Sequence, residues 1–184
     1  MTEILFGITG GIAAYKAAAA VSKLVQSGFG VDVVMTESAT QLIAPKTFEA
    51  LTNRPVRRSL FDTGTAHLHI ELARKAALFC IAPATANILA KAAAGIADDL
   101  VSTLILSFDG KILFAPAMNS VMWHKPAVQR NVRQLLDDGA VFIGPETGHL
   151  SCGETGTGRM TEPEQIVKEI QRLTYTGKTE NQNR

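Results

Sequence analysis

Short apolar runs alternate along this chain with longer stretches in which apolar residues recur at helical spacing. The apolar runs predict strands at residues 3–8, 30–36, 76–83, 112–119 and 140–145. The helical stretches lie between and after them, at residues 12–28, 37–51, 69–75, 85–95, 97–107, 125–139 and 163–173. Pro45 divides the second stretch into two short helices, because its ring disrupts the helical hydrogen bonding around it.

The regular alternation of strands and helices predicts an α/β fold. We expect a three-layer, Rossmann-like parallel sheet with helices on both faces. In such a sheet ligands bind beyond the carboxyl ends of the strands. The chain is expected to form one domain over residues 1–173, followed by a polar, frayed tail over residues 174–184.

The segment GHLSCGETGTGRM, residues 148–160, fits neither pattern. Its four glycines favour an irregular loop with no helix or strand. Each glycine loses more backbone freedom on folding than any other residue, so the segment is costly to order. We therefore expect another interaction to compensate for the entropic cost of ordering this segment.

Composition and charge exclude several classes of protein. The chain has 184 residues, 46% of them hydrophobic, and a formal net charge of +1. No apolar stretch approaches the roughly 20 residues of a membrane span, and no signal peptide is recognisable. We therefore expect a cytoplasmic protein that binds neither membrane nor nucleic acid, with Arg54, Arg57 and Arg58 forming a solvated surface. No metal ion is expected.

The two cysteines differ in their surroundings. Cys80 lies in an apolar run and is expected to be a buried, structural thiol. Cys152 lies among glycines and polar residues in the segment 148–160. In a reducing compartment both are expected to be thiols rather than a disulfide.

Two polar loops at strand ends suit a phosphate. In GITGGIAAYK, residues 7–16, glycines allow a ligand close to the backbone at a helix start, although the loop matches neither a Walker A motif nor GxGxxG. In MTESA, residues 35–39, hydroxyl groups surround Glu37, which favours a mononucleotide over NAD. The alternatives are a tight strand-to-helix turn in the first loop and a helix cap formed by Ser38 in the second.

Two further strand ends, IAPATAN (residues 81–87) and FAPAMNSVMW (residues 114–123), turn from Ala-Pro into small and amide residues. Such loops suit a planar ring held by a few hydrogen bonds. Asn119 could donate a hydrogen bond to a carboxylate, or serve only the turn. Met122 and Trp123 are expected in the core.

Of the four histidines, His69 has the setting of a catalytic group. It stands at a helix start, two residues before Glu71, where an imidazole could act as a base or a hydrogen-bond donor. His149 adjoins the segment 148–160, and His67 and His124 have no comparable surroundings.

Taken together and in order, the motifs HIELA, APATAN, ADDLVST, PAMNSVMW and SCGETGTGRM closely resemble the phosphopantothenoylcysteine decarboxylases of coenzyme A biosynthesis. These are homo-oligomeric flavin-containing cysteine decarboxylases. The resemblance extends over residues 3–172. It implies a flavodoxin-like fold that binds FMN, assembled as a trimer or a dodecamer, with the active site at a subunit boundary.

The resemblance also implies residue roles. His69, Asn119 and Cys152 match the catalytic histidine, the asparagine that binds the substrate carboxylate and the cysteine of a flexible substrate lid. Further substrate contacts fall on Met118, Arg159 and Met160. The FMN-binding positions are Gly10, Gly11, Ile12, Ser38, Thr85, Ala86, Asn87, Ile88 and Ala117.

The implied reaction converts 4′-phosphopantothenoylcysteine to 4′-phosphopantetheine. Oxidation of the cysteine side chain to a thioaldehyde creates an electron sink, loss of carbon dioxide gives an aminoenethiolate, and reduction yields the thiol. Cys152 is the expected proton donor in that last step, because a thiol of pKa about 8.5 is protonated at neutral pH. A separate phosphopantothenoylcysteine synthetase is a possible partner, since many bacteria fuse the two enzymes.

Three alternatives differ from this interpretation. A lantibiotic-processing enzyme would decarboxylate a C-terminal peptide cysteine and release the enethiol; Cys152 argues against it. A non-catalytic flavoprotein regulatory subunit would have acidic extensions, which this sequence lacks. A flavin prenyltransferase-like or NAD-binding enzyme would have no use for the PAMN and SCGETGTGRM segments.

Overall fold

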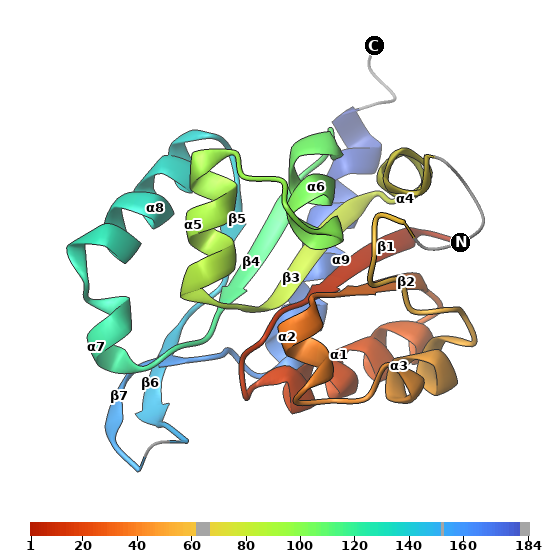
Figure 1. Cartoon of the computed structure of the whole chain (residues 1–184). Coiled ribbons are helices and arrows are strands. Elements are labelled where there is room, and N and C mark those ends of the chain that lie inside the picture. Colours follow the sequence, from red (N-terminus) through yellow and green to blue (C-terminus); the bar gives the residue numbers. More distant parts are fainter. Residues whose placement is uncertain (62–66, 152, 181–184) are drawn as a thin grey trace.

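The computed structural model describes residues 1–61, 67–151 and 153–180, and of residues 176–180 only the helical backbone. Within this part of the chain, parallel strands form one sheet in the order β2, β1, β3, β4, β5 (Figure 1). The strands are β1 (Glu3–Ile8), β2 (Gly30–Met35), β3 (Leu78–Ala84), β4 (Ile112–Pro116) and β5 (Val141–Phe142). This is the flavodoxin-like strand order, so the expected fold is confirmed.

Helices cover both faces of the sheet. One face packs against α1 (Ala14–Gln26), α3 (Pro45–Thr52) and α9 (Pro163–Glu180), and the other against α4 (Leu68–Lys75), α5 (Ala86–Ala94), α6 (Leu100–Ser107) and α8 (Pro126–Asp137). Strand β1 shows why both faces are apolar. Ile4 and Phe6 belong to the first core cluster and Leu5 to the second, because successive side chains of a strand point to opposite faces.

The expected break at Pro45 is confirmed. The short helix α2 (Glu37–Thr40) precedes it, and Pro45 is the first residue of α3. Proline suits that position because the missing N–H would have no partner in the first turn of a helix.

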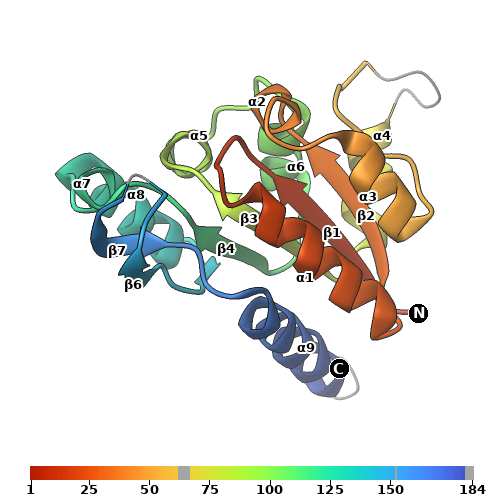
Figure 2. The same cartoon turned by 90° about the horizontal axis from the view of Figure 1, so that it is seen from below.

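The glycine-rich segment contradicts the expectation of a wholly irregular loop. Strands β6 (Glu146–His149) and β7 (Thr155–Arg159) form an antiparallel hairpin that includes most of it. Figure 2 shows this hairpin beside the short helix α7 (Ser120–Trp123), at the opposite edge of the molecule from α3. Glycine suits the strand positions 156 and 158 because the Ser120 side chain and the Met118 carbonyl lie too close for a Cβ atom.

Two smaller expectations need correction: the end of the last helix and the burial of Met122 and Trp123. Helix α9 does not end at Leu173, as expected, but continues to Glu180. Met122 is 46% exposed and Trp123 is only half-buried, rather than in the core, because α7 lies outside both core clusters.

No helix in the described part of the chain is both long and apolar enough to cross a membrane.

Arg54 is not part of a solvated surface. Its guanidinium donates to Glu3 and, at 3.1 Å, to Asp32, and Lys75 donates to the same Asp32 carboxylate at 2.6 Å. The hydrogen bond from Arg54 holds the pKa of the Glu3 carboxyl below its ordinary value, even though partial burial opposes this shift. This network joins the start of β1 to β2, α3 and α4.

Candidate functional site

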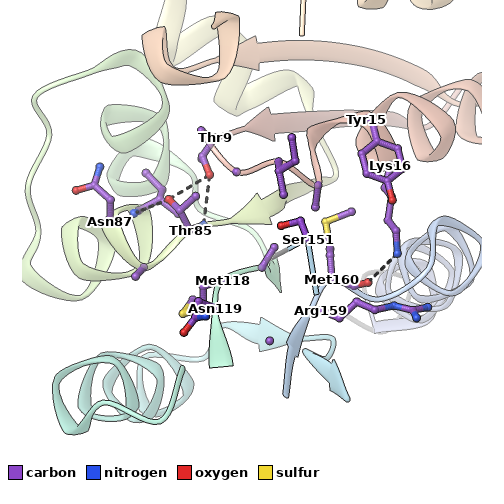
Figure 3. A pocket seen from close by; sticks show the side chains of 18 of the residues that line it. Thr9, Tyr15, Lys16, Thr85, Asn87, Met118, Asn119, Ser151, Arg159 and Met160 are labelled. Atoms are coloured by element: carbon purple, nitrogen blue, oxygen red, sulfur yellow. Dashed lines mark hydrogen bonds between the residues drawn. The ribbon is translucent and has the colours of Figure 1, made fainter. Parts of the chain in front are cut away.

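The carboxyl ends of β1 to β4 open on a cavity of about 1130 Å³, seen from close by in Figure 3. Its size exceeds the roughly 300–1,000 Å³ of ordinary small-molecule sites, so it has room for a cofactor together with a substrate. The hairpin β6–β7 and the start of α9 complete its wall. The cavity therefore lies at the carboxyl ends of the strands, where the site is expected.

The glycines of the first loop are needed because two loops converge. A Cβ atom on Gly10 would lie 2.5 Å from Cβ of Ser38, so the loops after β1 and β2 touch there. A Cβ on Gly11 would lie 3.3 Å from Pro83, near the end of β3, and 3.4 Å from Thr85, which follows this strand. Gly10 and Gly11 thus line the cavity where the converging loops leave little room for side chains, which brings the backbone close to any bound ligand.

The cap of α2 is formed by Thr36, not by Ser38. The Thr36 hydroxyl accepts a hydrogen bond from the amide of Ala39 at 3.3 Å. The alternative in which Ser38 caps the helix is therefore wrong. Ser38 is exposed and lines the cavity directly opposite Gly10.

Thr9 joins the first loop to the third. Its buried hydroxyl donates to the carbonyl oxygen of Pro83 at 2.6 Å and lies 3.3 Å from the Thr85 amide, which donates to it. Thr85 in turn caps α5 by accepting from the amide of Ile88. These bonds fix the segment from Thr85 to Ile88 along the cavity wall, and Figure 3 draws those between Thr9 and Thr85.

The PAMN turn after β4 supplies Ala117, Met118 and Asn119 to the cavity. The side-chain oxygen Oδ1 of Asn119 accepts from the amide of Val121 at 2.7 Å and so caps α7. The turn role is thus real, and it fixes the orientation of the amide group. The amide nitrogen is the donor end of this side chain, so a ligand carboxylate would be bound there.

The opposite wall is charged. Lys16 donates to the carbonyl oxygen of Met160 at 3.3 Å and to the carboxylate of Glu162 at 2.9 Å, and Arg159 binds the same carboxylate. The hydrogen bond from Lys16 is the main reason that the pKa of Glu162 lies below its ordinary value. In Figure 3 the Arg159 side chain extends away from Asn119, because Glu162 attracts its guanidinium.

The cavity brings together most of the residues that the sequence singled out. The predicted positions that line it are Gly10, Gly11, Ile12, Ser38, Thr85, Ala86, Asn87, Ile88, Ala117, Met118, Asn119, Arg159 and Met160. Met160 is also buried in the core cluster between α1 and α9, so it serves the fold as well as the cavity wall.

Of the three expected catalytic residues, only Asn119 is found among the described residues that line this cavity. His69, in the first turn of α4, is partly buried and is not among the lining residues. Cys152 lies outside the described residues, although its neighbour Ser151 lines the cavity.

The sequence analysis missed several lining residues, among them Thr9, Lys16, Lys91, Asp99 and His149. Burial alone would lower the pKa of Lys91, but its hydrogen bonds to Asp98 and Asp99 outweigh this effect and raise it. The ADDLVST motif contains both aspartates, so it could have pointed to this part of the cavity wall. No sequence motif could have identified Lys16, because its partners lie far along the chain.

Comparison with known proteins gives a consistent result. The chain is 47% identical over 168 residues to the coenzyme A biosynthesis bifunctional protein CoaBC of Bacillus subtilis, an alignment that covers 90% of this chain and 41% of that protein. The chain therefore spans less than half the length of this relative.

Two solved structures are similar over nearly their whole length. A mutant PPC decarboxylase complexed with pantothenoylaminoethenethiol matches with a TM-score of 0.83 and 29% identity, covering 95% of this chain and 98% of that one. The FMN-dependent cysteine decarboxylase SpaF matches with a TM-score of 0.81 and 32% identity, covering 96% and 97%. A model of the family described as Flavoprotein matches residues 1–175, and the chain belongs to this family.

Proposed function

We propose that this protein catalyses the FMN-dependent decarboxylation of 4′-phosphopantothenoylcysteine to 4′-phosphopantetheine, a step of coenzyme A biosynthesis. The observation that carries this proposal is the match over 95% of the chain to a PPC decarboxylase complexed with pantothenoylaminoethenethiol. The 47% identity to a coenzyme A biosynthesis protein supports the same substrate.

The residues present fit FMN. Gly10, where a Cβ atom would collide with Ser38, and Gly11 line the cavity without side chains at the start of a helix, which suits a phosphate, and Ser38 adds a hydroxyl. The segment from Thr85 to Ile88 and Ala117 present small or amide groups for the flat ring. When bound, FMN supplies reversible hydride transfer, which oxidises the cysteine side chain and later reduces the product.

Asn119 is proposed to hold the substrate carboxylate. Its amide nitrogen can donate to a carboxylate oxygen while the carbonyl oxygen remains bound to the amide of Val121. The cap thereby keeps the amide in one orientation before the substrate binds, which lowers the entropic cost of positioning the substrate. Loss of carbon dioxide from this position leaves the electron pair on the thioaldehyde, giving the aminoenethiolate.

His69 and Cys152 are proposed to move protons. His69 would orient the substrate and accept a proton during the oxidation, and Cys152 would donate one to carbon as the enethiolate is reduced. Since His69 does not line the cavity of its own chain, its role requires a homo-oligomer in which a neighbouring copy brings it to the site. A trimer, or a dodecamer built from trimers, is the proposed assembly.

A phosphopantothenoylcysteine synthetase is the proposed partner, because the matched Bacillus subtilis relative is a bifunctional protein. The product of the synthetase would be the substrate of this chain. Co-purification of the two proteins, or faster overall turnover when they are mixed, would support an association.

The main alternative is decarboxylation of a C-terminal peptide cysteine. The similarity to the cysteine decarboxylase SpaF is the observation that favours it. The FMN-loaded protein is given equal concentrations of 4′-phosphopantothenoylcysteine and of a peptide ending in cysteine, and the decarboxylated products are quantified. We expect at least a tenfold preference for 4′-phosphopantothenoylcysteine, about 1.4 kcal/mol of transition-state stabilisation. A preference for the peptide would overturn the proposed substrate.

A further inference from the structure

Strand β7 is joined to the turn that carries Asn119. The amide of Met118 donates to the carbonyl oxygen of Gly158 at 2.9 Å, and a Cβ atom on Gly158 would collide with the Met118 carbonyl. A Cβ on Gly156 would lie 2.7 Å from the Ser120 hydroxyl. The two glycines therefore allow β7 to lie directly against the turn, and any shift of β7 acts on Met118 and its neighbour Asn119.

The carboxyl end of β7 is joined to α1 through Lys16. This lysine, with only 13% of its side chain exposed, donates both to the Met160 carbonyl oxygen and to the Glu162 carboxylate. Arg159, the last residue of β7, binds the same carboxylate. One carboxylate thus holds two cations, one from α1 and one from β7.

Helix α1 begins directly after the loop of Gly10, Gly11 and Ile12. Lys16 lies in its first turns, so its side chain links the helix that follows the proposed phosphate loop to the strand that supports the Asn119 turn. The glycine loop and the segment of β7 that lines the cavity are far apart in sequence, and the ion pair of Lys16 connects the two.

We propose that Lys16 and Glu162 are positioning residues: their ion pair, shared with Arg159, sets the place of β7 and through it the place of the Met118–Asn119 turn in the cavity. The inference rests on the proposed function only where it concerns substrate binding. Its structural part, that the pair controls how β7 is seated, holds whatever the substrate.

The structural part is tested by hydrogen exchange on the FMN-loaded protein. Lys16→Met keeps most of the side chain's apolar length and removes the charge, and Glu162→Gln removes the charge from the other side. We expect both variants to accelerate exchange of the Met118 amide and of the β7 amides by roughly fivefold or more, the effect of about 1 kcal/mol. The double variant Lys16→Glu/Glu162→Lys should restore part of the protection.

A matched control is available on the same helix α1. Lys23 and Glu164 also form an ion pair between α1 and α9, with Nζ and Oε1 3.1 Å apart, but it does not contact β7. Lys23→Met removes a contact of the same chemistry and should leave the exchange of Met118 and β7 unchanged. Wild-type exchange in both Lys16→Met and Glu162→Gln, or equal acceleration in Lys23→Met, would overturn the inference.

Kinetics test the link to substrate. The hydrogen bonds within the glycine loop run from Gly11 to Thr9 and from Ala14 to Gly11, and the Lys16 side chain takes no part in them. The FMN content of Lys16→Met should therefore remain at the wild-type level. We expect KM for 4′-phosphopantothenoylcysteine to rise in Lys16→Met more than kcat falls, and Lys23→Met to change neither. An inactive wild type would refute the proposed function alone, whereas an active wild type with unchanged KM in Lys16→Met would refute the role in substrate positioning.

Discussion

The Thr9 hydroxyl lies 2.6 Å from the carbonyl oxygen of Pro83, and this one contact joins the carboxyl end of β1 to that of β3. Thr9 is only 2% exposed, so the hydroxyl has no access to bulk water. The Thr9 hydroxyl oxygen also accepts a hydrogen bond from the amide of Thr85. The loop that follows Thr9 and the segment that begins at Thr85 are the two sides of the proposed flavin site, and Thr9 sets their separation.

Thr9→Val should therefore impair both stability and flavin binding. Valine has nearly the shape of threonine but leaves the Pro83 carbonyl and the Thr85 amide without their partner, at a cost of about 1–3 kcal/mol. Urea unfolding measures the stability, and quenching of flavin fluorescence on binding measures the FMN affinity. Thr9→Ser retains the hydroxyl and should remain close to wild type in FMN affinity; equal losses in both variants would contradict the role of the hydroxyl.

Gly10→Ala should weaken FMN binding more than Gly11→Ala. The new methyl group at position 10 would lie 2.5 Å from Cβ of Ser38, so one of the two loops must shift. At position 11 the nearest atoms, on Pro83 and Thr85, lie at 3.3 and 3.4 Å, and small adjustments suffice. Titration of the apoproteins with FMN gives the two affinities. Equal affinities would show that the approach of the first loop to Ser38 does not shape the site.

The ion pair of Glu3 and Arg54 should make stability depend on pH. The pKa of Glu3 is lowered in the folded state, mainly by the hydrogen bond from Arg54, so the carboxylate stabilises the fold above its unfolded pKa of about 4.3. That contribution is lost as the pH falls through the lower, folded pKa. Between about pH 5 and pH 3 the wild type should thus lose more unfolding free energy than Glu3→Gln.

Urea unfolding at several pH values measures this difference. Glu169→Gln is a suitable control, because Glu169 is paired with Arg172 within one helix and the Arg172 side chain is 59% exposed. Its pH dependence should resemble that of the wild type more closely. An identical acid dependence of the wild type and Glu3→Gln would contradict the assigned role of the Arg54 network.

Cys152→Ser should separate decarboxylation from the final protonation. We expect this variant to bind FMN and release carbon dioxide but to accumulate the unsaturated enethiol, because serine is too weak an acid to replace the thiol. Cys80→Ala is the control: Cys80 is fully buried, burial raises the pKa of its thiol, and its removal should leave the product unchanged. Production of the saturated thiol by Cys152→Ser at the wild-type rate would rule out the proton-donor role.

The fold was predictable because its signals are local. The apolar runs around Phe6, Phe79 and Phe114 are bounded by polar turns, and these three side chains are fully buried in the central strands. The loops at the strand ends were equally visible, because parallel strands bring their carboxyl ends to one edge.

The hairpin and the charged wall could not be predicted in the same way. Gly156 and Gly158 argue against a strand locally, and only their contacts with Ser120 and Met118 explain why β7 forms. Lys16 resembles any helical surface lysine until its partner Glu162 is seen beside it. Both features depend on long-range pairs, for which a single sequence carries no pattern.

The mass of the product formed from 4′-phosphopantothenoylcysteine tests the central claim most directly. The FMN-loaded protein is incubated with this substrate without an external oxidant, and product mass and carbon dioxide are measured together. The proposed function predicts a product lighter than the substrate by carbon dioxide alone, formed in equal amount to the gas over many turnovers. No release of carbon dioxide, or a product that lacks two further hydrogens, would contradict it.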